Sequence, residues 1–177
     1  SDLDVRVVNP GAIFGPGGEQ GNTSKLLIAL AQGKLGPLVP PGGMSVVGVG
    51  DTARGVRLAL ERGRRGARYL LTDEFLCTRD LCERAVARMR SRGIPARSPR
   101  FSVPRFMWPV AVAAVRALEC FHEPRLTTSR ALRVAGPDWR ASSERAREEL
   151  GWRPDSFDRV LEETLDDLQA RGLLDSR

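Results

Sequence analysis

The sequence predicts an α/β fold in which short buried strands alternate with amphipathic helices. Three short apolar runs, at residues 5–8, 44–49 and 68–72, are bounded by turn residues, as is typical of buried strands. A helical pattern begins after Asp51 and ends at Gly63, between the second and third runs. Apolar residues make up 41% of the 177 residues, so a sizeable core can form.

The first expected strand, 5–8, is closed by a turn and followed by a glycine-rich loop at 15–18. A helix follows, with Thr23 or Ser24 as its N-cap and Gly33 at its end. Apolar side chains at helical spacing are expected on its inner face: Leu26, Leu27, Leu30 and Ala31. A second loop is expected at 37–43, because its composition is rich in proline and glycine.

Asp51 stands at the N-cap position of the helix that joins the runs at 44–49 and 68–72. Its inner face is expected to contain four residues at helical spacing: Ala53, Val56, Ala59 and Leu60. Two strands joined by a helix of this length form a βαβ unit, which we expect to be parallel and right-handed.

Helices dominate the second half of the sequence. Thr78 is the expected N-cap of a helix with this inner face: Leu81, Ala85, Val86 and Met89. A connection rich in proline and arginine leads to a helix after Pro104 that is apolar nearly all round. We expect a buried or interface helix that packs on several sides, and the apolar segment 101–115 suggests a hydrophobic substrate pocket or a dimer face. A short helix at 127–134 and a short strand at 138–141 are expected next.

Two further helices complete the expected fold. Ser142 or Ser143 is the expected N-cap of the first, and Gly151 is expected just beyond its end. Asp155 or Ser156 is the expected N-cap of the second. Its apolar stripe consists of Phe157, Val160, Leu161, Thr164, Leu165 and Leu168.

The formal net charge is +6, and nearly all the positive charge is arginine. The arginines are spread over most of the chain, which favours a solvated surface over a nucleic-acid interface. The stretch 103–121 is the most apolar, but it contains charged residues, so a membrane span is not expected. Three cysteines at irregular spacing fit a reducing compartment such as the cytoplasm. We therefore expect neither a membrane nor a nucleic acid as partner.

The residues alone define no catalytic or metal site. The loop at 15–18 does not open directly into a helix, as a dinucleotide loop must. His122 is the only histidine, and a helix-end residue is the favoured interpretation. Tyr69 has Asp73 four residues on and is expected to be structural. Zinc is not expected, because the cysteine spacing does not suit it.

Three stretches, 7–17, 41–51 and 142–154, together resemble the extended short-chain dehydrogenase/reductase family, also called the NAD-dependent epimerase/dehydratase superfamily. This family includes dihydroflavonol reductase-like enzymes, 3β-hydroxysteroid dehydrogenases and nucleotide-sugar epimerases. The stretches resemble the strand and loop beside the nicotinamide, a later strand with its acidic helix start, and the C-terminal signature. They occur in the family's order, so the resemblance covers the C-terminal half of the family pattern.

The resemblance implies the latter part of a Rossmann-type doubly wound parallel sheet, plus a mostly helical substrate-binding lobe. Residues 1–75 would supply the strands and helices of the Rossmann-type domain, with a substrate-lobe insertion at about 16–43. Residues 76–177 would form the substrate-binding lobe. The missing N-terminal cofactor-binding half would be a partner, and a homodimer is a further possibility.

The family's glycine-rich loop and its Tyr-x-x-x-Lys pair lie upstream of the part that matches, so no catalytic residue is expected in this chain. The resemblance implies that NAD or NADP binds against Pro10, Gly11, Ala12 and Ile13. It also implies that Asn9 and Asn22 contact substrate. For Asn9, a strand-end residue that satisfies the local backbone is an equally good interpretation.

Two departures bear on the substrate. Met44 or Ser45 stands where nucleotide-sugar epimerases usually carry a phosphate-binding arginine, and Gly48 replaces a common His or Asp. The favoured function is therefore the substrate-binding portion of an NAD(P)-dependent oxidoreductase that acts on a carbonyl or secondary alcohol. A nucleotide-sugar epimerase or dehydratase, and a non-catalytic binding module that lacks the cofactor half, are the alternatives. The chain alone is expected to be inactive.

Overall fold

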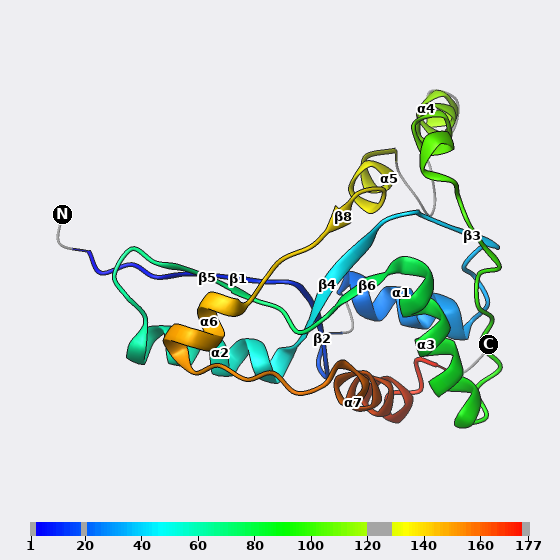
Figure 1. The fold of residues 1–177 in the computed structure, drawn as a ribbon. Coiled ribbons are helices and arrows are strands. Elements are labelled where there is room, and N and C mark those ends of the chain that lie inside the picture. Colours follow the sequence, from blue (N-terminus) through cyan, green and yellow to red (C-terminus); the bar gives the residue numbers. More distant parts are fainter. Residues whose placement is uncertain (1–2, 19–20, 120–128, 175–177) are drawn as a thin grey trace.

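The computed structural model describes residues 3–18, 21–119 and 129–174. The chain has a mixed α/β fold with parallel strand pairs and helices packed against them (Figure 1). The strands are β1 (Val7–Pro10), β2 (Ala12–Phe14), β3 (Leu38–Val39), β4 (Gly43–Gly48), β5 (Arg68–Leu71), β6 (Phe75–Cys77), β7 (Phe101–Ser102) and β8 (Asp138–Trp139). The α-helices are α1 (Asn22–Ala31), α2 (Val49–Arg62), α3 (Thr78–Ser91), α4 (Trp108–Glu119), α5 (Ser129–Ala135), α6 (Glu144–Leu150) and α7 (Phe157–Ala170). A 3₁₀ turn, η1 (Arg105–Met107), precedes α4.

Strands β1 and β2 are consecutive but belong to different strand ladders. β1 pairs in parallel with β5, whereas β2 pairs in parallel with β4. Gly11 separates the two strands, and its N–H donates to the Leu71 carbonyl at 3.0 Å. A Cβ at Gly11 would lie 2.3 Å from the Ser45 carbonyl oxygen, so only glycine allows this close approach of the two backbones.

The two strands of the expected βαβ unit, β4 and β5, do not pair with each other in the described part of the chain. Each pairs in parallel with the same extended segment instead, β4 with β2 and β5 with β1. The chain bends after β5, and its continuation β6 pairs antiparallel with β4. The Asp73 N–H donates to the Val46 carbonyl at 2.8 Å at this bend. The bend redirects the strand across the sheet, which hydrophobic periodicity does not reveal.

Two buried clusters form the core. The larger lies among α1, α3, α7 and the strands β2 and β4, and it contains Leu27, Leu81, Leu161 and Leu165. The smaller lies beneath α2 and α6 and contains Tyr69, Leu71 and Trp152. The predicted inner faces of α3 and α7 are confirmed, since every residue named for them is buried.

Three predicted N-caps were wrong by a few residues. Helix α2 begins at Val49 with Gly48 as its N-cap, so Asp51 lies inside its first turn. Thr78 is the first residue of α3, and the sulfur of the N-cap Cys77 accepts the Asp80 N–H. Helix α1 starts at Asn22, and its N-cap is Gly21, two residues before the predicted Thr23.

The predicted inner face of α2 was only partly right. Ala59 is buried, but Val56 and Leu60 are 41% and 67% exposed. Asp51 and Gly55 are buried instead. A Cβ at Gly55 would lie 2.3 Å from a Leu71 methyl carbon, so the helix contacts the sheet through its smallest residue.

The ends of α6 and α7 agree with the sequence. Gly151 follows α6 in the left-handed conformation, with φ of 66°. Ser143 and Ser156 are the N-caps of α6 and α7, although neither side chain makes a capping hydrogen bond. The Asp73 carboxylate accepts the Phe157 N–H at 3.0 Å instead.

Other described residues do not bury helix α4 on several sides, so the interpretation as a buried helix was wrong, while the alternative of an interface helix stays a prediction. Val112 is its one buried residue among those described. Strands β2, β3, β6 and β7 were not predicted. Residues 37–43 and the stretch before Pro104 were interpreted as connections, and no strand was assigned at 12–14 or 75–77. The predicted short helix is α5, whose first expected residues, 127–128, lie outside the described residues.

Candidate functional site

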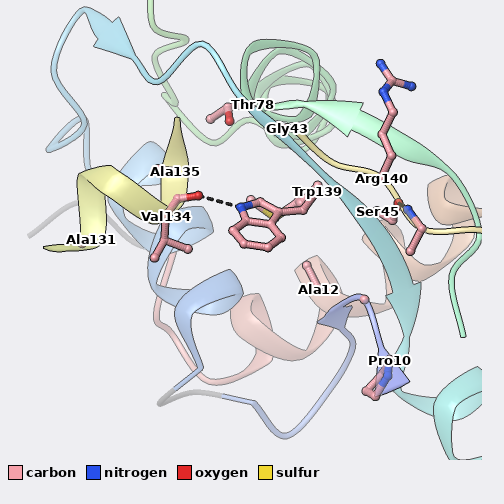
Figure 2. Close-up of a pocket in the computed structure, with 13 residues that line it drawn as sticks. Pro10, Ala12, Gly43, Ser45, Thr78, Ala131, Val134, Ala135, Trp139 and Arg140 are labelled. Carbon is pink, nitrogen blue, oxygen red and sulfur yellow. Dashed lines mark hydrogen bonds between the residues drawn. The ribbon is translucent and has the colours of Figure 1, made fainter. Parts of the chain in front are cut away.

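A cavity of about 540 Å³ lies where the β1–β2 junction, the start of β4, α5 and β8 meet (Figure 2). Pro10, Gly11 and Ala12 form one wall, and Met44 and Ser45 form the floor. The opposite wall comes from α5 and β8, and β8 pairs in parallel with the start of β4. The volume is in the range of pockets that bind drug-sized ligands.

The α5–β8 wall is apolar, and a side-chain hydrogen bond joins its two elements. The Trp139 indole N–H donates to the Val134 carbonyl at 2.7 Å, as Figure 2 shows. Ala131, Ala135 and Ala141 complete this wall. Because the indole N–H is used within the wall, Trp139 offers its ring faces to a ligand.

Polar groups at the cavity are few. The Ser45 hydroxyl oxygen accepts the Ala141 N–H at 3.1 Å, which leaves its own O–H as a donor for a ligand. The Thr78 hydroxyl donates to the Gly42 carbonyl at 2.7 Å.

Arg140 is the only charged residue among those that line the cavity. Its guanidinium carbon lies 3.6 Å from the centroid of the Phe75 ring, a cation–π contact. Figure 2 shows the side chain extending away from Trp139. The cavity wall is thus apolar apart from hydroxyl and backbone groups.

The structure brings together three of the six residues predicted from the resemblance. Pro10, Gly11 and Ala12 line the cavity, while Ile13 lies just beyond it in β2, opposite Val47. Asn9 is exposed in β1, opposite Leu70. Asn22 is the exposed first residue of α1. Neither asparagine is among the residues that line the cavity.

The sequence alone did not identify the α5–β8 wall as part of a site. A short strand at 138–141 was expected, but nothing in its local pattern indicates that it pairs with Gly43 and Met44. The apolar spacing of Val134 and Ala135 is equally typical of a core-facing helix.

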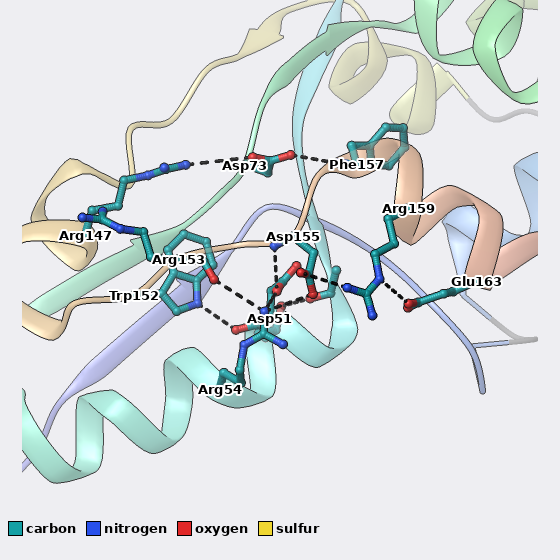
Figure 3. A network of polar contacts seen from close by, with 12 residues as sticks. Asp51, Arg54, Asp73, Arg147, Trp152, Arg153, Asp155, Phe157, Arg159 and Glu163 are labelled. Carbon is teal, nitrogen blue, oxygen red and sulfur yellow. Dashed lines mark hydrogen bonds and ion pairs between the residues drawn. The ribbon is translucent and has the colours of Figure 1, made fainter.

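Behind the cavity, a polar network ties the C-terminal signature to α2 (Figure 3). Asp51 is 2% exposed, and its Oδ1 accepts the Asp155 N–H at 3.1 Å and contacts Arg54. The Trp152 indole N–H donates to the Asp51 backbone carbonyl at 2.9 Å. Burial raises the pKa of Asp73, while the Phe157 N–H that it accepts acts in the opposite direction. This network fixes the start of α7, and none of its residues is among those that line the cavity.

Tyr69, the only tyrosine, is fully buried in the smaller core cluster. Its hydroxyl donates to Glu149 at 2.8 Å and accepts the Arg64 N–H at 2.9 Å. The hydrogen bond from the Arg64 side chain, with further bonds from Tyr69 and Arg145, lowers the pKa of Glu149 to about 2. These contacts confirm the prediction that Tyr69 is structural.

Other candidates give no site. Among residues 3–18, 21–119 and 129–174, no group of three or more His, Cys, Asp or Glu could hold a metal ion. None of the helices in that same part is long and apolar enough to cross a membrane. His122 and Cys120 lie outside the described residues. Cys82 is buried, which raises the pKa of its thiol to about 12, so it is not a nucleophile.

The α/β fold and the cavity at the β1–β2 junction indicate a class of protein. The chain has the Rossmann-like fold of epimerase/dehydratase enzymes, and it matches about half of those chains. It is 27% identical to a nucleoside-diphosphate-sugar epimerase from Pseudomonas aeruginosa, with a TM-score of 0.73, covering 98% of this chain and 51% of that one. The fold is shared with the dTDP-glucose 4,6-dehydratase of Streptomyces venezuelae, solved with NAD bound (21% identity, TM-score 0.65, 96% and 45% covered).

Among curated proteins, the chain is 30% identical to sterol demethylase protein B of Methylococcus capsulatus. The match covers 97% of this chain and 52% of the relative, so the chain spans about half the length of that relative. No family model matches the chain.

Proposed function

We propose that this chain is the substrate-binding portion of an NAD(P)-dependent oxidoreductase that acts on a carbonyl or secondary alcohol of an apolar molecule. The observation that carries the proposal is the cavity, in which the segment expected beside the nicotinamide forms one wall and apolar residues form the other. In this arrangement a hydride acceptor or donor at Pro10–Ala12 would face an apolar substrate against Trp139.

The fit of a nicotinamide cofactor rests on the backbone at the junction. Pro10 has no N–H, and the Gly11 N–H is bonded to the Leu71 carbonyl, so neither residue of this wall offers a backbone donor to a cofactor. A cofactor there would supply the hydride. Met44, Ser45 and Trp139 would position the substrate, and the Ser45 O–H is available as a hydrogen-bond donor.

A nucleotide-sugar epimerase or dehydratase is the second candidate, and the likeness to the P. aeruginosa epimerase favours it. A diphosphate substrate needs cations that point at its phosphates. At this cavity the lone arginine is stacked on Phe75, and Met44 and Ser45 occupy the floor. We therefore expect no measurable binding of UDP by calorimetry, and clear binding would favour the second candidate.

In this proposal, residues 1–75 belong to the Rossmann-type part and residues 76–177 to the substrate lobe. Catalysis would then require a tyrosine and a lysine from an upstream segment, because Tyr69 is committed to Glu149. The chain alone would bind substrate weakly and turn nothing over. A non-catalytic binding module remains the third candidate, and absence of an upstream Tyr-x-x-x-Lys motif in the gene would favour it.

The test uses the full-length protein with NADPH or NADH and a panel of apolar ketones, followed by nicotinamide absorbance. Ala131→Leu narrows the cavity from its exposed α5 wall and is expected to lower kcat/KM for a bulky ketone at least about tenfold. Ala53→Leu, on exposed α2, is the matched control and should leave kcat/KM unchanged. Equal activity of the two variants, or no turnover with any ketone, would refute the proposal.

A further inference from the structure

Ser45 differs from the other hydroxyl residues around the cavity floor. The hydroxyl of Thr78 donates to a backbone carbonyl at 2.7 Å. Thr72 donates to the Ala141 carbonyl at 3.0 Å, and Ser143 donates to the Thr72 carbonyl at 2.7 Å. The Ser45 hydroxyl accepts the Ala141 N–H at 3.1 Å, but its own hydrogen has no acceptor among the described residues. The Ser45 O–H is therefore a donor that the described part of the protein leaves unused.

This unused donor is buried at the boundary of the cavity. Ser45 is 4% exposed, and Ser45 lines the cavity together with Ala141, whose N–H it accepts. A buried donor without an acceptor lowers stability, so nearly all such groups in folded proteins have a partner. The partner that a cavity can supply is a ligand atom that accepts a hydrogen bond, such as an oxygen.

The donor is also held in a fixed place. The Ala141 peptide is bound on both sides, its N–H by Ser45 and its carbonyl by Thr72. The backbone of Ser45 pairs with Phe75 of β6, and its carbonyl lies against Gly11. A donor whose backbone and hydroxyl oxygen are both fixed selects ligands by the position of their acceptor.

The ring of Trp139 supplies a second contact for the same ligand. Trp139 is 56% exposed, although its indole N–H is bonded to Val134 and its backbone pairs with Met44 of β4. Figure 2 shows this ring among the residues that line the cavity. A large flat ring that is exposed yet held in one orientation favours a flat ligand, because aromatic rings gain from offset stacking.

We propose that the ligand of this cavity is a planar aromatic or fused-ring molecule whose ring stacks on Trp139 and whose oxygen accepts a hydrogen bond from Ser45. This inference rests on the proposed function, in which the cavity holds the substrate, and it assigns Ser45 as a specificity-determining residue. A hydrocarbon of the same shape would leave the Ser45 O–H unpaired, and a site built around such a donor discriminates strongly against it.

The test is calorimetry of the full-length protein, without cofactor, with two ligands of nearly the same shape. 2-Acetylnaphthalene carries the oxygen, and 2-isopropenylnaphthalene has a CH₂ group in its place. Ser45→Ala should weaken binding of the ketone about tenfold and leave binding of the hydrocarbon unchanged. Ser24→Ala is the matched control, because Ser24 is 3% exposed in α1 and does not line the cavity, and it should change neither affinity.

A second variant tests the planar class. Trp139→Leu removes the flat ring and should weaken 2-acetylnaphthalene about fivefold more than it weakens its saturated counterpart, 2-acetyldecalin. Equal weakening of the two ketones, or no binding of 2-acetylnaphthalene to the wild type, would refute a planar ligand.

The assignment of Ser45 fails on either of two results. If Ser45→Ala weakened both naphthalenes equally, Ser45 would only hold the segment at Ala141. If it left the affinity for 2-acetylnaphthalene unchanged, water would be the acceptor of the Ser45 hydrogen. Calorimetry needs no turnover, so Ser45-dependent binding without reduction of any ketone would sink the proposed reaction alone, and reduction of ketones without dependence on Ser45 would sink this inference alone.

Discussion

Replacing Gly11 by alanine tests the junction that forms the cavity wall. The new Cβ would lie 2.3 Å from the Ser45 carbonyl oxygen and 3.1 Å from a Thr72 methyl carbon. Real Cβ atoms essentially never approach closer than 3.0 Å, so β2 and β4 must separate by about 0.7 Å. The opposing atom belongs to the backbone, and therefore no change of rotamer relieves the contact.

Overpacking of this kind costs about 1–3 kcal/mol of unfolding free energy. At about 2–4 °C per kcal/mol for a chain of this size, Gly11→Ala should lower the melting temperature by about 2–12 °C. Differential scanning calorimetry measures this shift. Gly50→Ala is the matched control, because Gly50 lies in α2 with nothing within 4 Å of its would-be Cβ.

The control should shift stability in the opposite direction. Alanine at Gly50 restricts the unfolded chain and suits the helix, so we expect a gain of about 0.4–1 kcal/mol. If Gly11→Ala melted at or above the wild-type temperature, the close approach of the Gly11 and Ser45 backbones would be wrong, and with it the geometry of the cavity wall.

Three further predictions concern stability and association. Asp51→Asn weakens charge-assisted hydrogen bonds in a buried site and should lower the free energy of unfolding by about 2 kcal/mol in chemical denaturation. Asp166 is 70% exposed, so Asp166→Asn should change this free energy by less than about 0.5 kcal/mol. Similar losses of unfolding free energy in the two variants would contradict the role of Asp51. Arg64 holds the pKa of Glu149 at about 2, below its ordinary 4.5, so this stabilisation is present above pH 4.5 and is lost as the pH falls towards 2. Thermal melts from pH 6 to 3 should therefore fall more steeply for the wild type than for Glu149→Gln, and parallel curves would refute the assignment. The free side of β1 should make the isolated chain associate at high concentration, and a clean monomer by light scattering would count against this.

The sequence was most informative where structure depends on local periodicity. All six residues of the predicted α7 stripe are buried, because a 3.6-residue repeat of apolar side chains matches one helix face. The glycine after α6 was recognised because a helix end in the left-handed conformation favours glycine.

Long-range geometry was the part that the sequence could not supply. The direction of β6 depends on a bend at Asp73, and the α2 face depends on Gly55 accommodating Leu71. Likewise, the cavity needs Trp139 beside Met44, residues far apart in the sequence that the β4–β8 pairing brings together. The resemblance led to Pro10, Gly11 and Ala12, but not to the wall that faces them.

The division of one extended segment between two ladders has a mechanical consequence. Because β1 pairs with β5 and β2 pairs with β4, Gly11 is the point at which the two strand ladders join. A rotation of one ladder relative to the other about Gly11 would change the width of the cavity, because residues 10–12 form one of its walls. A ligand that contacts both ladders in the cavity would therefore fix the angle between them. The close contact between Gly11 and the Ser45 carbonyl would limit how small that angle can become.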